Sequence, residues 1–274
     1  MADAPALDVR FAADDPALRD RLSAALDDFE PSAIHENEHG DVWRVFFRTP
    51  EQRDAARVRV TSELPLLLTS PIDVADEDWA RRSQADLRAI DVGGLIVAPP
   101  WDSRHSKPVI VIEPSMGFGT GHHATTRLCL RLMQRLDLRG ARAIDVGTGS
   151  GVLALAAWKL GASDVVAVDN DPDALENARV NIARNGAGGA IDIVPETLER
   201  LRLERADVAV ANLTAAVLVR HAASLESLLR PNGVLVISGF APDDVLEVCG
   251  AFRREVTDAL HEDEWTALTL APSS

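Results

Sequence analysis

The residues from 145 to 151 place an acidic side chain directly before three alternating glycines. The apolar segment 141–146 that leads into them is typical of a buried strand, and the apolar segment 152–160 that follows is typical of a helix. A glycine has no Cβ, so a ligand can approach the backbone of such a turn closely. The glycines predicted to contact a ligand are Gly147, Gly149 and Gly151.

A second carboxylate follows the next predicted strand, 165–168. Asp169 lies about 22 residues beyond Gly147, near the spacing at which an acidic residue meets ribose hydroxyls in nucleotide-binding folds. The glycines form G-x-G-x-G rather than the dinucleotide pattern G-x-G-x-x-G, because Val152 stands at the third dinucleotide glycine. Asp145 would repel a pyrophosphate but suits a ligand that carries an ammonium group. Together these residues favour S-adenosylmethionine over a plain tight turn or a nicotinamide cofactor.

A second glycine-rich loop precedes this unit at 117–121, and His122 and His123 follow it. Thr125 or Thr126 is expected to cap or begin the helix that comes next. Two glycine loops before two helices are able to enclose one ligand from two sides.

At this point the chain resembles a known family. The segments that carry the resemblance are GFGTGHHATTRLCL, DVGTGSG, VDNDPDA, ANLTA and EWTAL. They look like the bacterial ribosomal protein methyltransferases called PrmA, which methylate protein eleven of the large ribosomal subunit. The match runs from about Trp79 to the C-terminus.

The resemblance implies a class I S-adenosylmethionine-dependent methyltransferase and a large-subunit ribosomal protein as its partner. By that resemblance, the cofactor-contacting positions are Thr126, Gly147, Asp169 and Asn212. The residues of the turn itself add Asp145, Gly149 and Gly151 to the expected cofactor site, and no metal is expected.

Methyl transfer to a lysine needs a neutral amine. At pH 7 the deprotonation of a lysine costs roughly 4.6 kcal/mol, which desolvation and a nearby sulfonium can lower. We expect a carbonyl at Asn212 to hold the amine, and Phe118 to close over the methyl group as part of a mobile lid. The sequence N-L-T-A at Asn212 departs from the N-P-P-Y of many enzymes that methylate planar nitrogens.

The composition limits the class of protein. The 274 residues are 46% hydrophobic and carry a net charge of −15, which argues against a general nucleic-acid binder. The start of the chain has no apolar signal core, and no run of about 18 apolar residues occurs, so we expect a cytoplasmic protein. We also expect a monomer. Cys129 is expected in the core, and His35 with His39 is not expected to bind a metal.

Residues 1–70 show the order β-α-β-β-α-β and no catalytic cluster, which predicts a ferredoxin-like domain. The resemblance implies that this domain recognises the substrate. Residues 71–94 are expected to be a linker with a helix at 76–89, and residues 95–274 a doubly wound Rossmann-like methyltransferase sheet. Alternatives are a methyltransferase of another protein or a small molecule, a nicotinamide oxidoreductase, and a non-catalytic S-adenosylmethionine-binding module.

Overall fold

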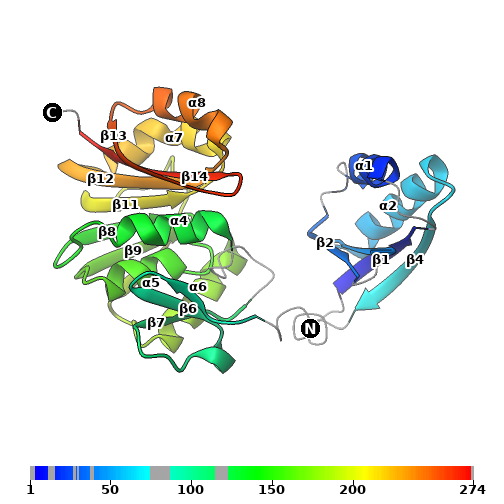
Figure 1. Ribbon diagram of the computed structural model, residues 1–274, viewed down its shortest axis with the longest axis horizontal. Helices are drawn as coiled ribbons and strands as arrows, with labels where there is room; N and C mark the ends of the chain where they lie inside the picture. The colour runs from blue at the N-terminus through cyan, green and yellow to red at the C-terminus, as the bar shows by residue number, and fades with distance from the viewer. Residues whose placement is uncertain are drawn as a thin grey trace. The chain divides into compact units, whose positions relative to one another are not determined.

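The computed structural model describes residues 4–11, 16–26, 29, 31–37, 40–74, 87–114 and 123–272. The chain forms two compact units, Met1–Asp86 and Leu87–Ser274, which are drawn in Figure 1. Among the described residues, none of the helices has the length and apolar composition that crossing a membrane would take.

The first unit is a four-stranded antiparallel sheet with two helices. Its elements are β1 (Ala4–Arg10), α1 (Pro16–Leu26), β2 (Ala33–Glu36), β3 (Val42–Phe46), α2 (Pro50–Glu63) and β4 (Leu68–Val74). The strand order is β2-β3-β1-β4, which confirms the predicted ferredoxin-like pattern. Alternate residues of β1, Leu7 and Val9, are fully buried against Leu22 of α1 and Val60 of α2.

The last strand of this unit differs from the prediction. We expected the first domain to end at residue 70 and a linker to begin at 71, whereas β4 continues to Val74 and pairs with β1 along its whole length. Pro71, the first residue of the expected linker, lies in an edge strand opposite Leu7. An edge strand tolerates proline because the N–H that proline lacks has no neighbouring strand to bond.

The predicted linker is also shorter at its far end. Residues 87–89 are not helical, and Ile90–Val92 form β5, which pairs antiparallel with β6 (Leu95–Ala98). Gly93 and Gly94 make the turn between them, with Gly93 at φ 70°. Two glycines between apolar segments are typical of a β-hairpin turn, so Gly93 and Gly94 indicate a connection between two strands and not a linker. The rest of the predicted helix, 76–86, lies outside the described residues.

The second unit is built on a seven-stranded sheet of order β10-β9-β8-β11-β12-β14-β13. Its strands are β8 (Arg142–Val146), β9 (Asp164–Asp169), β10 (Ile191–Pro195), β11 (Ala206–Asn212), β12 (Leu229–Phe240), β13 (Glu255–Glu262) and β14 (Trp265–Ala271). The first five pair in parallel, and β14 adds an antiparallel edge with β13. The structure confirms the predicted doubly wound sheet.

Helices cover both faces of this sheet (Figure 1). One face packs against α4 (Ala124–Met133), α5 (Val152–Lys159) and α6 (Pro172–Arg184), and the other packs against α7 (Ala215–Ser227) and α8 (Val245–Ala251). The strands are therefore apolar on both sides, as buried parallel strands are. Cys129 of α4 is fully buried in the first of these cores, as predicted, and burial raises the pKa of its thiol.

The sequence misplaced one boundary on the second face. Proline, asparagine and glycine at 231–233 are typical of a turn between a helix and a strand, but α7 ends at Ser227 and β12 already begins at Leu229. The register between β11 and β12 shifts from Leu229 to Val234, so the Pro-Asn-Gly segment is an irregularity inside the strand. Proline cannot donate to the ladder and is found at such irregularities.

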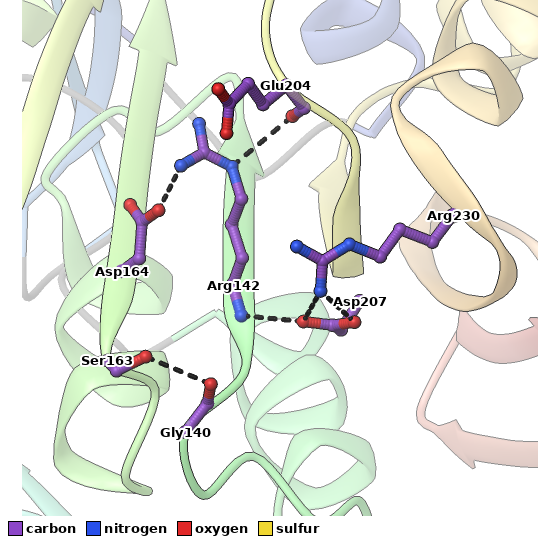
Figure 2. A network of polar contacts seen from close by, with 7 residues as sticks. All are labelled: Gly140, Arg142, Ser163, Asp164, Glu204, Asp207 and Arg230. Carbon is purple, nitrogen blue, oxygen red and sulfur yellow. Dashed lines mark hydrogen bonds and ion pairs between the residues drawn. The ribbon is translucent and has the colours of Figure 1, made fainter.

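Charged side chains align the strands at the amino end of the sheet (Figure 2). Arg142 of β8 donates its backbone N–H to Asp207 of β11 at 2.9 Å, and its guanidinium pairs with Asp164 of β9. Arg230 of β12 reaches Asp207 at 2.5 Å. This network joins four adjacent strands at their amino ends. A ligand of an open α/β sheet binds at the opposite edge, beyond the carboxyl ends of the strands.

Asn181 in α6 and Asn185, which directly follows this helix, attach the small sheet of β5, β6 and β7 (Val109–Val111). Asn185 accepts from the Val111 backbone N–H at 2.8 Å and donates to its carbonyl at 2.6 Å. Asn181 is fully buried; its side chain accepts from the Glu113 N–H at 2.8 Å and donates to the Ser150 carbonyl at 2.8 Å. One side chain thus fixes the glycine-rich turn relative to the end of the small sheet.

Candidate functional site

The glycine-rich turn connects β8 to α5 in a conformation that suits glycine. Gly147, Gly149 and Gly151 have φ values of 72°, 53° and 82°. A Cβ on Gly147 would lie 2.6 Å from Leu213 Cδ2, and one on Gly151 would lie 3.4 Å from Ala178 Cβ. Positive φ disfavours larger residues at all three positions, and at Gly147 the nearby Leu213 side chain disfavours them further.

Asp145 lies beneath the turn and is 2% exposed. Its Oδ2 accepts from the Thr148 hydroxyl at 2.6 Å and from the Ala154 backbone N–H at 3.0 Å, so it connects the end of β8 to the first turn of α5. Burial raises the pKa of Asp145 to about 6, although these two bonds oppose the rise. Within the described part of the chain, Oδ1 is buried without a hydrogen-bond partner.

Asp169 ends β9 beside the turn. Its Oδ2 accepts from the Gly149 N–H at 2.9 Å, and its Oδ1 accepts from the N–H groups of Asn170 and Asp171 at 2.9 and 3.1 Å. Because an ionised carboxylate has about four acceptor positions, Asp169 retains capacity for ligand hydroxyls. The carboxylate thus supports the turn and lines the cavity beside it.

Asn212 ends β11 and contacts the start of α4. Its Nδ2 donates to Thr125 Oγ1 at 3.1 Å and approaches Thr126 Oγ1 at 3.5 Å. Thr125 Oγ1 lies 2.7 Å from His123 Nδ1, and the His123 side chain caps α4. Burial lowers the pKa of His123, and Arg127 lowers it further, which favours a neutral imidazole whose Nδ1 accepts from Thr125. Because Nδ2 of Asn212 faces the two threonines, its amide oxygen points away from them.

A cavity of about 260 Å³ opens beside the turn at the carboxyl ends of the strands. Its apolar wall comes from Val146, Gly147, Val168, Leu198, Leu213 and Val217. Its polar groups are Asp169, Asn170, Glu196, Thr197, Glu199 and His221. A lining that combines apolar side chains with several polar groups suits a flat ring attached to a hydroxylated sugar.

The predicted residues therefore fall into three groups. Gly147 and Asp169 line the cavity, whereas Asp145, Gly149 and Gly151 shape the turn from below or behind. Asn212 and Thr126 lie near the start of α4, and Leu213, the residue after Asn212, lines the cavity. Phe118 and His122 lie outside the described residues.

Several residues of the site were not identified from sequence. Thr125, which was weighed only as a cap, is the closer contact of Asn212, and Asn181 holds Ser150. Glu196–Glu199 carry no motif, although their position directly after β10 was a usable signal, because carboxyl ends of parallel strands converge. His221 lies within α7, where only the spacing from Val217 places it on the same helix face.

Comparison with known proteins assigns the family. The model of the family "Ribosomal protein L11 methyltransferase (PrmA)" matches residues 31–272. The chain belongs to the ribosomal protein L11 methyltransferase family. This confirms the resemblance predicted from the motifs.

Similar proteins carry the same family name. The L11 methyltransferase of Symbiobacterium thermophilum is 42% identical over 196 residues, which cover 70% of this chain and 61% of that protein. That of Chloroflexus aurantiacus is 37% identical over 251 residues, which cover 80% and 76%. A solved ribosomal protein L11 methylase from Lactobacillus delbrueckii subsp. bulgaricus is 27% identical with a TM-score of 0.63, covering 69% of this chain and all of that one.

The buried Asp145 gives a prediction for stability against pH. Its pKa is raised from 3.8 to about 6 in the folded chain, so the folded state binds the proton more tightly than the unfolded state does. The contribution is complete below pH 4 and is lost as the pH rises through 6, by about 3 kcal/mol in total and about half of that between pH 5 and 8. Asp145→Asn removes the titration, so the unfolding free energy of the native protein relative to this variant should fall over that range.

Urea unfolding at a series of pH values measures this difference. Asp137→Asn is the control, because Arg139 holds the pKa of the exposed Asp137 carboxyl at about 2, below the range tested. A wild-type curve that runs parallel to the Asp145→Asn curve from pH 5 to 8 would show that Asp145 does not titrate there.

Proposed function

We propose that this protein transfers methyl groups from S-adenosylmethionine to amines of ribosomal protein L11, on lysine side chains, the N-terminus or both. The observation that carries the proposal is the junction at Leu213. Asn212, oriented by Thr125, is the residue directly before Leu213 in the sequence, and Leu213 itself lines the cavity. A cofactor in the cavity would therefore meet an amide oxygen next to it.

The residues of the site fit S-adenosylmethionine. Asp169 retains acceptor capacity for ribose hydroxyls at one side of a cavity with apolar walls. Asp145 Oδ1 is a buried acceptor without a partner among the described residues, and an ammonium group is the kind of donor that such an atom lacks. The bound cofactor would supply a methyl group already activated by its sulfonium charge.

The protein's own contribution is alignment and control of a proton. A target ammonium has no lone pair, so it must lose a proton before it can accept a methyl group. The Asn212 amide oxygen accepts one N–H of the neutral amine and directs the lone pair, because its Nδ2 is already committed to Thr125. Exclusion of water from this region favours the neutral amine further. Phe118 remains a proposed part of that enclosure.

The first unit is proposed to recognise the protein substrate. A small ferredoxin-like sheet without a catalytic cluster suits binding, and its edge strands β2 and β4 keep one side of the backbone unpaired in the described part of the sheet. The methyltransferase chemistry belongs to the second unit.

Mass spectrometry of purified ribosomal protein L11, after incubation with this protein and isotopically labelled S-adenosylmethionine, tests the function. We expect labelled methyl groups on amines. Asn212→Ala should lower the rate by about tenfold to a hundredfold, since one hydrogen bond to the reacting amine is lost. Asn232→Ala, an exposed asparagine of β12, is the matched control. Cofactor binding without any label on L11 would favour a methyltransferase of another substrate.

Cofactor binding is tested at Asp169. Asp169→Ala removes the acceptor of the ribose hydroxyls and of the Gly149 N–H, so the affinity for S-adenosylhomocysteine should fall by about 1–3 kcal/mol in calorimetry. Asp171→Ala is the control, because Asp171 caps α6 and does not line the cavity. An equal loss in both variants would attribute the effect to the loop and not to the ligand.

A fragment of residues 87–274 tests whether the first unit recognises the substrate and the second unit carries out methyl transfer. It keeps β5 with its partner β6, and we expect it to bind S-adenosylhomocysteine as tightly as the full chain does. Its rate on intact ribosomal protein L11 should fall sharply, because the recognition surface is gone. Methylation of L11 at the full rate would contradict the role given to the first unit.

A further inference from the structure

Asn181 of α6 is a fully buried side chain that bridges two backbone segments. Its Nδ2 donates to the Ser150 carbonyl at 2.8 Å and to Asn177 Oδ1 at 3.2 Å, and its Oδ1 accepts from the Glu113 N–H at 2.8 Å. Both amide hydrogens and one lone pair of the oxygen are therefore occupied. A buried amide that is committed on both sides holds its two backbone partners at one distance from each other.

The side of α6 that contains Asn181 also contacts both segments through its neighbours. Ala178, three residues earlier, lies against Gly151 of the turn, where an added Cβ would be 3.4 Å from the Ala178 Cβ. Asn185, four residues later, holds the backbone of Val111 through both of its amide atoms. Residues three and four apart share one side of a helix. This side of α6 therefore contacts the turn near Ala178 and β7 near Asn185, and Asn181 lies between.

Glu113 lies at the start of a connection that leads to the residues around Asn212. In the sequence, residues 114–122 join Glu113 to His123. His123 caps α4 and contacts the Thr125 hydroxyl, which accepts from Asn212. The first end of the connection is thus attached to the cofactor turn, and the second end is attached to the residue that we propose holds the target amine.

We propose that Asn181 is a positioning residue for methyl transfer, because it sets the start of this connection at a fixed distance from the turn that holds the methyl donor. Transfer requires the methyl group and the target amine in line, and a displacement of about 1 Å by a change far from the reacting atoms can lower the rate about a hundredfold. Asn181 touches neither reactant and acts through Ser150 and Glu113. The inference rests on the proposed function, because it requires S-adenosylmethionine at the turn.

Hydrogen exchange of the native full-length chain is the first test. S-adenosylhomocysteine bound at the turn restrains Ser150, and Asn181 passes this restraint to the Glu113 N–H that it accepts from. Exchange of the Glu113 amide should therefore slow by about fivefold or more at saturating ligand. In Asn181→Leu the ratio of the exchange rates without and with the ligand should fall to about one at this amide.

The kinetics of a matched pair of variants separate positioning from stability. Asn181→Leu and Asn185→Leu each remove a side-chain amide from the same side of α6 and leave a backbone N–H at the end of the small sheet without its partner. Both should lower the free energy of unfolding. Only Asn181→Leu should lower kcat for methylation of ribosomal protein L11 at saturating cofactor, by about tenfold to a hundredfold, with KM for L11 within about twofold of the native value.

The outcomes are distinct. Slower exchange of the Glu113 amide in the native chain, together with a loss of kcat in Asn181→Leu alone, supports the positioning role. If ligand binding leaves that amide unchanged, or if the two variants have equal kcat, Asn181 only stabilises the fold and the inference is overturned while the proposed function stands. The exchange measurement on the native chain decides the matter even where Asn181→Leu does not fold. If the native protein binds no S-adenosylhomocysteine, the proposed function fails and this inference fails with it.

Discussion

A buried carboxylate holds the site together. Asp145 is taken out of water at the end of β8, and the cost of doing so appears in its raised pKa. Its bonds to Thr148 and to the Ala154 N–H offset part of that cost, and they fix the turn relative to α5. Asp169 and Asn181 then hold the turn from two other elements. These two contacts depend on this arrangement, because the Gly149 N–H and the Ser150 carbonyl belong to the turn that Asp145 fixes.

In the proposed function, one region of the site binds the cofactor and another orients the target amine. Leu213 lines the cavity, while the residue before it, Asn212, hydrogen-bonds to the start of α4. Because these two are adjacent in β11 and the loop after it, the proposed cofactor and acceptor amine would approach the same short segment. The network of Arg142, Asp207 and Arg230 aligns the strands at the far edge, so the carboxyl ends come together in register.

Much of this was readable in the sequence, for identifiable reasons. The doubly wound sheet follows from strands that alternate with helices, and Asp145, Asp169 and Asn212 each follow an apolar strand, which places them at one edge. The prediction from sequence failed where one residue type is compatible with two different local structures. Pro71 lies in an edge strand rather than a linker, and Gly93 turns a hairpin. His221 could not be found, because a helical position shows its neighbours only after the chain has folded.

Two glycines from distant parts of the chain enclose Leu213, and they constrain its evolution differently. A side chain at Gly147 would meet the Leu213 side chain, so a smaller residue at 213 would relieve that collision. A side chain at Gly239, where φ is 102°, would lie 2.3 Å from the Leu213 carbonyl oxygen, and every amino acid has that oxygen. Compensation of the side-chain contact is therefore open to position 147, although its φ of 72° still favours glycine or asparagine, and it is closed to position 239. Among descendants of this sequence, position 239 should remain glycine even where 147 and 213 change together.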